Sequence, residues 1–226
     1  MREKLIYVLA AAASLLLARN LAMIFLHLPD EASQGMIYRI IFFHVPAWWT
    51  AMLGAIVSLV ASVLFLVKKD FRHDSLAVAA TEAGLAFLTI GLVTGTIWAR
   101  IIWGIWWTWD ARLTSALICW ILYGGYLILR RTVDEPTQRA TLAAVYSIFA
   151  FVDVPIVWFS IRWWRTQHPQ PVFGQGGFLE ADMKSTLLWN FLAVGLIGVI
   201  LLLIRLQQEE NLREIDALRR ETHAIS

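Results

Sequence analysis

The chain has 226 residues, of which 59% are hydrophobic and only 16% are charged, and its formal net charge is +2. A soluble domain carries charge on about a quarter of its residues, so these figures exclude an ordinary water-soluble protein. The small net charge gives no reason to expect binding to nucleic acid. The single cysteine, Cys119, excludes an internal disulfide and any CxxC motif.

Long apolar runs follow one another along the chain, most of them near the ~20 residues that a helix needs to cross ~30 Å of hydrocarbon. They predict an all-α membrane protein with six transmembrane helices, in one domain over residues 1–204, followed by a charged tail over 205–226. The predicted spans are Leu5–Leu28, Pro46–Val67, Leu76–Trp98, Thr114–Leu129, Thr141–Ile161 and Leu187–Ile204.

Basic residues are shared unequally between the two sides of this predicted bundle. Because Lys and Arg gather in cytoplasmic loops, the bias predicts that both termini are cytoplasmic. The connections at 29–45, 99–113 and 162–186 then face outward. The side of the termini carries Arg2, Lys4, Lys68, Lys69, Arg72, Arg130, Arg131, Arg139, Arg205, Arg213, Arg219 and Arg220, and the outer side carries Arg39, Arg100, Arg112, Arg162, Arg165 and Lys184.

Tryptophan is concentrated in the second outer connection, because five of the 12 indoles lie within Trp98–Trp109. If this stretch is helical, four residues share one face by their spacing: Trp103, Trp106, Trp107 and Asp110. Large aromatic rings bury ~150–250 Å² each, so these indoles predict a broad apolar shelf. A flat, apolar ligand with polar edges is the natural complement of such a surface.

Charged residues and a glycine accompany the indoles. Arg100 and Arg112 are placed to meet carboxylates of a ligand, because guanidinium pairs well with that group. Gly104 allows close approach of a planar group, and Asp110 could orient Arg112 or an indole N–H. An ordinary aromatic belt at the membrane surface is the alternative interpretation.

Two histidines of the outer connections each lie beside proline and tryptophan. Pro46 favours extended geometry at Val45, so we expect His44 just before the second span begins. His168 precedes Pro169, which stiffens its loop. Imidazole commonly ligates haem iron, and two imidazoles can occupy both axial positions. Hydrogen-bonding interfacial histidines are the alternative.

These residues resemble a known family. Residues 103–114, Trp-Gly-Ile-Trp-Trp-Thr-Trp-Asp-Ala-Arg-Leu-Thr, are similar to the WWD signature of haem-handling proteins, and we call them the WWD segment. Phe-His-Val-Pro at 43–46 and Thr-Gln-His-Pro at 166–169, in a six-span chain of this length, resemble the cytochrome c maturation protein C (CcmC) family.

The resemblance implies a protein of the bacterial inner membrane that handles haem for cytochrome c biogenesis. It implies haem b at the outer (periplasmic) face, with His44 and His168 as axial iron ligands. It also implies presentation of that haem to the chaperone CcmE, rather than conventional enzyme chemistry, and association with the ABC transporter subunits CcmA and CcmB and the small membrane protein CcmD. The matching WWD residues are Trp103, Trp106, Trp107, Trp109 and Asp110.

Two other functions stay open. A transmembrane haem exporter is compatible with six spans and with the intramembrane Glu82 and Asp153, although we find no inverted repeat. An oxidoreductase subunit with bis-histidine haem, such as a cytochrome b, normally carries its histidines within spans. His44 and His168 are predicted to lie outside them.

Overall fold

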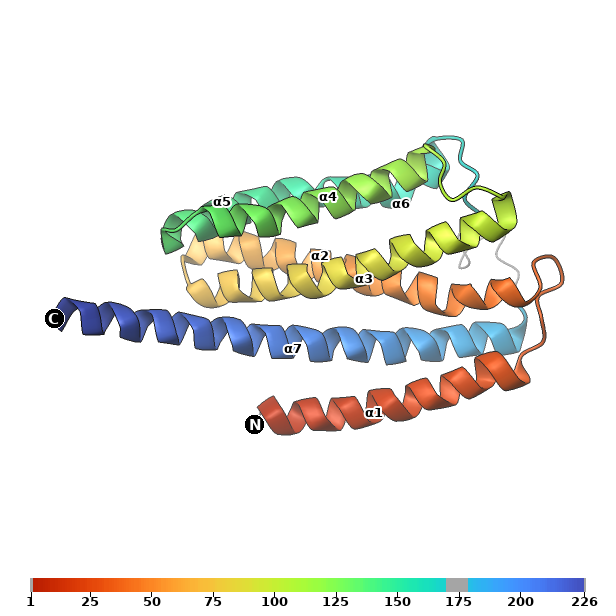
Figure 1. Cartoon of the computed structure of the whole chain (residues 1–226), viewed down its shortest axis with the longest axis horizontal. Helices are drawn as coiled ribbons and strands as arrows, with labels where there is room; N and C mark the ends of the chain where they lie inside the picture. The colour runs from red at the N-terminus through yellow and green to blue at the C-terminus, as the bar shows by residue number, and fades with distance from the viewer. Residues whose placement is uncertain (1, 170–178, 226) are drawn as a thin grey trace.

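The computed structural model describes residues 2–169 and 179–225, and this part of the chain forms a bundle of helices (Figure 1). A π-helical turn, η1, extends the first helix, and a 3-10 turn, η2, leads into the second. The elements are α1 (Arg2–Ala22), η1 (Met23–His27), η2 (Met36–Ile40), α2 (Ile41–Lys68), α3 (Phe71–Trp103), α4 (Ala111–Thr132), α5 (Pro136–Phe151), α6 (Asp153–Trp163) and α7 (Ala181–Ile225).

Six helical segments are long and apolar enough to cross a bilayer, which confirms the predicted all-α, six-span class. The fifth segment combines α5 and α6, which meet at Val152. Pro155 explains this break, because it has no N–H for the carbonyl of Phe151. The second segment begins at Met36, ten positions before the predicted Pro46, so that boundary was wrong.

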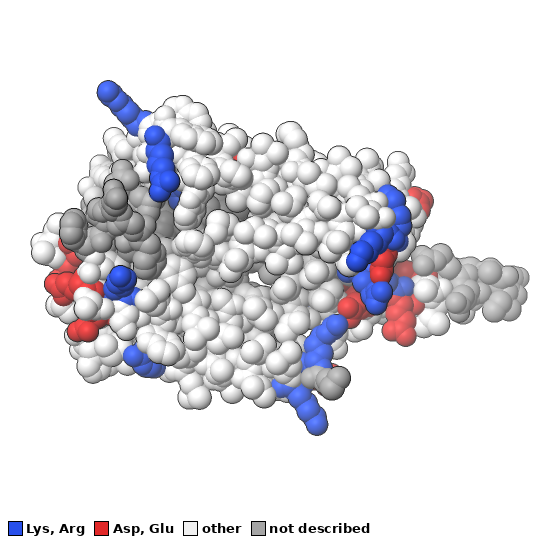
Figure 2. Space-filling view, turned by 180° about the vertical axis from the view of Figure 1, so that it is seen from behind, with Lys and Arg blue, Asp and Glu red and all other residues white. Residues whose placement is uncertain are grey.

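The surface also suits a lipid environment. Figure 2 shows charged side chains gathered toward the two ends of the molecule, with a broad uncharged band between them on the face in view. Large apolar side chains of the spans are exposed in the isolated chain, for example Val60, Val93 and Phe149 at 51%, 52% and 63%. Water does not tolerate so much contiguous apolar surface, whereas hydrocarbon does.

The start of α1 and the end of α7 lie toward one end of the bundle, and the connections α1–α2 and α3–α4 lie at the other, as do the end of α6 and the start of α7 (Figure 1). This arrangement agrees with the prediction that successive spans cross the membrane in opposite directions. Which end faces the cytoplasm stays a prediction from the basic residues. The predicted tail continues α7 without a break in the helix.

Helices α2 and α3 form the tightest pair in the bundle. A Cβ atom on Gly54 would lie only 2.9 Å from the Cα of Gly84, so the two backbones touch here. Ala47, Ala51 and Ala55 continue the small face of α2 into the core. This close packing makes α2 and α3 one rigid support for the residues at their outer ends.

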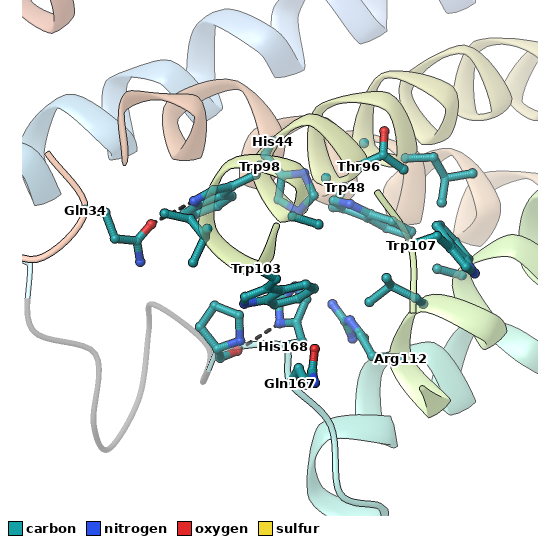
Figure 3. A pocket seen from close by; sticks show the side chains of 18 residues that line it. Gln34, His44, Trp48, Thr96, Trp98, Trp103, Trp107, Arg112, Gln167 and His168 are labelled. Atoms are coloured by element: carbon teal, nitrogen blue, oxygen red, sulfur yellow. Dashed lines mark hydrogen bonds between the residues drawn. The ribbon is translucent and has the colours of Figure 1, made fainter. Parts of the chain in front are cut away.

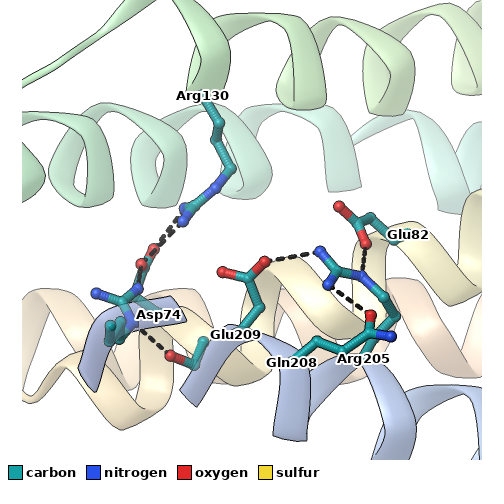
Figure 4. A network of polar contacts seen from close by, with 8 residues as sticks. Asp74, Glu82, Arg130, Arg205, Gln208 and Glu209 are labelled. Atoms are coloured by element: carbon teal, nitrogen blue, oxygen red, sulfur yellow. Dashed lines mark hydrogen bonds and ion pairs between the residues drawn. The ribbon is translucent and has the colours of Figure 1, made fainter. Parts of the chain in front are cut away.

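A network of ion pairs ties three helices together at the end that carries the termini (Figure 4). The carboxylate of Asp74, 3% exposed, accepts from Arg130 of α4 at 2.6 and 3.0 Å and also from Arg213 of α7. Arg205 of α7 donates to Glu82 of α3. The intramembrane Glu82 therefore has a structural role in joining α7 to α3.

Candidate functional site

A cavity of about 220 Å³ lies at the end of the bundle opposite the chain termini (Figure 3). Its walls come from α2, α3, α4, the WWD segment and the loop after α6. A larger cavity of about 640 Å³ shares several of its residues and continues between α2, α3, α4 and α6, to Thr81 and Tyr123. Residues that line both are Gln34, His44, Trp48, Trp98, Arg112, His168 and Pro169.

His44 lies inside α2 and is only 7% exposed. The prediction that it stands before the helix was wrong, since α2 begins at Ile41 and runs through Pro46. Its Nδ1 is 3.0 Å from Oγ1 of Thr94 on α3. The ring sits so close to α3 that a Cβ on Gly95 would lie 3.0 Å from its Cε1.

Two indoles surround the His44 ring at its edges. Trp98 of α3 and Trp48 of α2 contact it in T-shaped geometry, with centroid distances of 5.8 and 6.3 Å. Nε1 of Trp98 donates to Oε1 of Gln34 at 2.7 Å, which fixes that ring toward the α1–α2 connection. Trp48 and Trp98 were missed as site residues. Their signal was present, because Trp48 follows His44 by one helical turn.

The WWD segment is not the helix that the shared-face interpretation required. α3 ends at Trp103, and Gly104 has a φ of 77°, the left-handed region that favours glycine after a helix. The chain is then non-helical until α4 begins at Ala111. As a result the indoles separate: Trp103 and Trp107 line the cavity, whereas Trp106 and Trp109 are 61% and 77% exposed.

His168 lies in the loop after α6 and faces the same cavity as His44 (Figure 3). Its Nδ1 is 2.8 Å from the carbonyl oxygen of Pro169. Burial of the ring and the positive charge of Arg112 lower the pKa of His168 to about 4. The imidazole is therefore neutral at pH 7, and the structure brings together the two predicted histidines.

Asp110 fixes the position of the His168 loop. Its Oδ1 accepts from the N–H of Leu113 at 2.9 Å, as the N-cap of α4. Its Oδ2 accepts from the hydroxyl of Thr166 at 2.6 Å and from the N–H of Gln167 at 3.2 Å. Asp110 thus joins the WWD segment to the loop of His168. In the described part of the chain its carboxylate accepts hydrogen bonds from Leu113, Thr166 and Gln167, rather than from Arg112 or an indole N–H.

The two predicted arginines separate in the structure. Arg112 lines the cavity, donates to the carbonyl of Val157 and places its guanidinium 5.9 Å from the ring centroid of Trp48. Arg100 donates to the carbonyl of Gly104 and is exposed. It does not line the cavity. Of the two predicted arginines, Arg112 is therefore the one placed to meet an anionic group of a ligand there.

Fold and site together define a polytopic membrane protein with an aromatic cavity at one end of its bundle, in which two imidazoles and one guanidinium meet. The chain belongs to the CcmC family, described as Heme exporter protein C, whose family model matches residues 1–221. The family resemblance of the sequence motifs is therefore confirmed.

Individual relatives support this membership. The chain is 39% identical over 213 residues to Heme exporter protein C of Bradyrhizobium diazoefficiens, which covers 93% of this chain and 81% of that protein. It is 34% identical over 180 residues to Heme exporter protein C of Escherichia coli K12, covering 79% and 73%. It is 37% identical over 149 residues to a putative cytochrome c biosynthesis ccmC-like mitochondrial protein of Marchantia polymorpha, covering 66% and 63%.

Proposed function

We propose that this chain binds haem b at the periplasmic face of a bacterial inner membrane and presents it to the chaperone CcmE for cytochrome c biogenesis. Membership of the Heme exporter protein C family supports the ligand class. The cavity supports it independently, because aromatic walls suit a macrocycle and Arg112 suits a propionate. The observation that carries the proposal is the pair of imidazoles, whose hydrogen bonds prepare both for iron.

The Thr94 hydroxyl determines which nitrogen of His44 carries the proton. We assign the single hydrogen of this hydroxyl to a carbonyl of its own helix, that of Ile90 at 2.7 Å or of Gly91 at 3.2 Å, so toward His44 it acts as an acceptor. With this assignment Nδ1 of His44 is the N–H donor, and Nε2 keeps the lone pair. Metal-binding histidines commonly hold their other ring N–H in this way.

The carbonyl of Pro169 has the same effect on His168. A carbonyl oxygen can only accept, so the short contact identifies Nδ1 of His168 as the donor and leaves Nε2 with the lone pair. With a pKa near 4, the ring does not need to lose a proton before it ligates a metal at pH 7. Two neutral imidazoles, each with a basic Nε2, would suit the ligation of haem iron.

The chain acts on haem by positioning. When bound, haem supplies the iron that the imidazoles ligate and the vinyl edge that CcmE would modify. Trp103 and Trp107 line the cavity and would contact the macrocycle, whereas Trp106 and Trp109 of the WWD segment are exposed. The complex with CcmA, CcmB and CcmD belongs to the same proposal, with these exposed indoles as its candidate contact surface.

The larger cavity favours transmembrane haem export as a second candidate function. It connects the histidine end to Thr81 and Tyr123 in the bundle interior, and its volume of about 640 Å³ lies within the range of roughly 300–1,000 Å³ typical of ligand pockets.

The structure changes the case against an oxidoreductase subunit, because that case relied on both histidines lying outside the spans. His44 is in fact inside a span, so its position no longer separates this chain from a cytochrome b. Family membership makes that separation instead.

The optical spectrum of the purified protein tests the proposed function. We expect haem to co-purify and to give the low-spin spectrum of two imidazole ligands, and we expect CcmE added in excess to receive it. A protein that purifies without haem, and takes up none when haem is added, would contradict the proposal. Haem that is bound with this same low-spin spectrum but never passes to CcmE would favour the oxidoreductase alternative.

Thr94 offers a test of the tautomer argument. Thr94→Val keeps the shape of the side chain but removes the acceptor of the Nδ1–H bond. We expect about tenfold weaker haem binding with an unchanged low-spin spectrum, in the range that loss of an outer partner of a ligating histidine costs. Titration of the haem-free protein with haem measures this. Thr132→Val is the matched control, because the Thr132 hydroxyl likewise bonds a carbonyl of its own helix, that of Leu129, and the residue does not line the cavity.

A further inference from the structure

A proline in the helix that carries His44 leaves one backbone group without its usual partner. In a regular helix the N–H of residue 46 would bond the carbonyl of Phe42, but Pro46 has no N–H. Phe42 is only 1% exposed, so water does not replace the missing donor. A buried carbonyl without a partner is costly, and the helix could avoid that cost by unwinding its first turn.

Asn190 of α7 supplies the missing donor. Its Nδ2 donates to the carbonyl of Phe42, and its Oδ1 accepts from Nδ2 of Asn20 at 3.1 Å. Both asparagines are 0% exposed. Arg19 donates to Oδ1 of Asn20 at 3.1 Å, which continues the chain to the surface of α1. A series of side-chain hydrogen bonds across α1, α7 and α2 therefore ends on the carbonyl of Phe42, two residues before His44.

We propose that Asn190 is a positioning residue for the haem site, through the first turn of α2. The residue before a proline ordinarily prefers extended geometry, which is what the sequence alone predicts at Val45. By bonding the carbonyl of Phe42, Asn190 keeps this turn helical and holds His44 within reach of Thr94. Asn20 orients the Asn190 amide so that its NH₂ group points at the carbonyl. The haem part of this inference rests on the proposed function.

The test combines loss of the donor with repair of the helix. Asn190→Leu removes the donor, and we expect about tenfold weaker haem binding and a smaller low-spin fraction, as for one lost hydrogen bond to a buried group. Pro46→Ala restores the N–H of residue 46, so the double variant should recover the wild-type affinity. Ser62→Ala is the control, a buried hydroxyl of α2 for which the structure shows no hydrogen bond.

A second measurement needs no haem. Diethyl pyrocarbonate modifies accessible, neutral imidazole, and His44 is nearly buried in the wild type. In the haem-free protein we expect faster modification of His44 in Asn190→Leu and a return to the slow rate when Pro46→Ala is added, read by peptide mass spectrometry. Unchanged modification in Asn190→Leu, or acceleration that Pro46→Ala fails to reverse, overturns the inference. This outcome is independent of whether the wild type binds haem.

Discussion

Replacing His168 with alanine is expected to abolish the bis-imidazole spectrum while the protein still folds and inserts. Within the described residues the ring of His168 bonds the carbonyl of Pro169 in its own loop, and the bond from its backbone N–H to Thr166 is kept by alanine, so the replacement breaks no hydrogen bond to a helix. The iron would lose one axial ligand. Loss of a ligand costs more than loss of an outer partner, so haem affinity should fall by more than about a hundredfold. His44→Ala should give the same spectral loss.

Imidazole in solution makes this prediction specific. In either variant a free imidazole is the size of the ring that was removed, and at position 44 the space lies beside Gly95, Trp48 and Trp98. Added imidazole should therefore restore the low-spin spectrum. His27→Ala is the matched control, because His27 is exposed and lies outside the cavity. Wild-type spectra in both histidine variants would remove the assignment of the ligands.

The fold was largely predictable from the sequence, and the reason is the bilayer. In hydrocarbon the backbone N–H and C=O groups of a span have no water to bond. A long apolar run must therefore form these hydrogen bonds within itself, which a helix does. The spans and the all-α class follow from this rule. The start of α2 was not predictable in this way. The helix continues through Pro46 because Asn190 bonds the carbonyl of Phe42, and these two residues are 148 positions apart in the sequence. Local reasoning at Val45 lacks that partner.

The site was predictable in its chemistry and not in its geometry. Residue types alone suggested two imidazoles and an aromatic wall, and His44, His168, Trp103 and Trp107 do line one cavity. The helical interpretation of the WWD segment failed at Gly104, whose positive φ ends α3. Once the helix ends, the 3.6-residue period no longer decides which indoles share a face.

Asp110 shows how a motif residue acquires a role that its spacing does not reveal. Its carboxylate caps α4 with one oxygen and holds the loop of His168 with the other. The partners on that loop are Thr166 and Gln167, separated from Asp110 by 56 and 57 positions. The carboxylate is therefore better described as a support for His168 than as a contact to the ligand.

The second large effect that we expect comes from Asp110→Asn. Asparagine is a good N-cap, so its oxygen keeps the bond from Leu113 and α4 should lose almost no stability. The amide NH₂ then faces the N–H of Gln167, donor against donor, and its bond to Thr166 survives only with the hydroxyl as acceptor, so the hold on the loop of His168 is weakened. Haem affinity should fall by about 10- to 100-fold, with a growing high-spin fraction as His168 detaches from the iron. Haem titration and the optical spectrum measure both.

Comparison with a cap elsewhere separates the two functions of this carboxylate. Asp70 caps α3 through the N–H of Arg72 at 2.9 Å, and it lies far along α3 from the cavity. Asp70→Ala should lower the thermal stability, as a lost cap does, and leave the haem spectrum intact. Asp110→Asn should instead leave the stability almost unchanged and weaken haem binding. If instead Asp110→Asn lowers thermal stability and keeps wild-type haem affinity, the carboxylate serves only α4, and His168 must be held by other contacts.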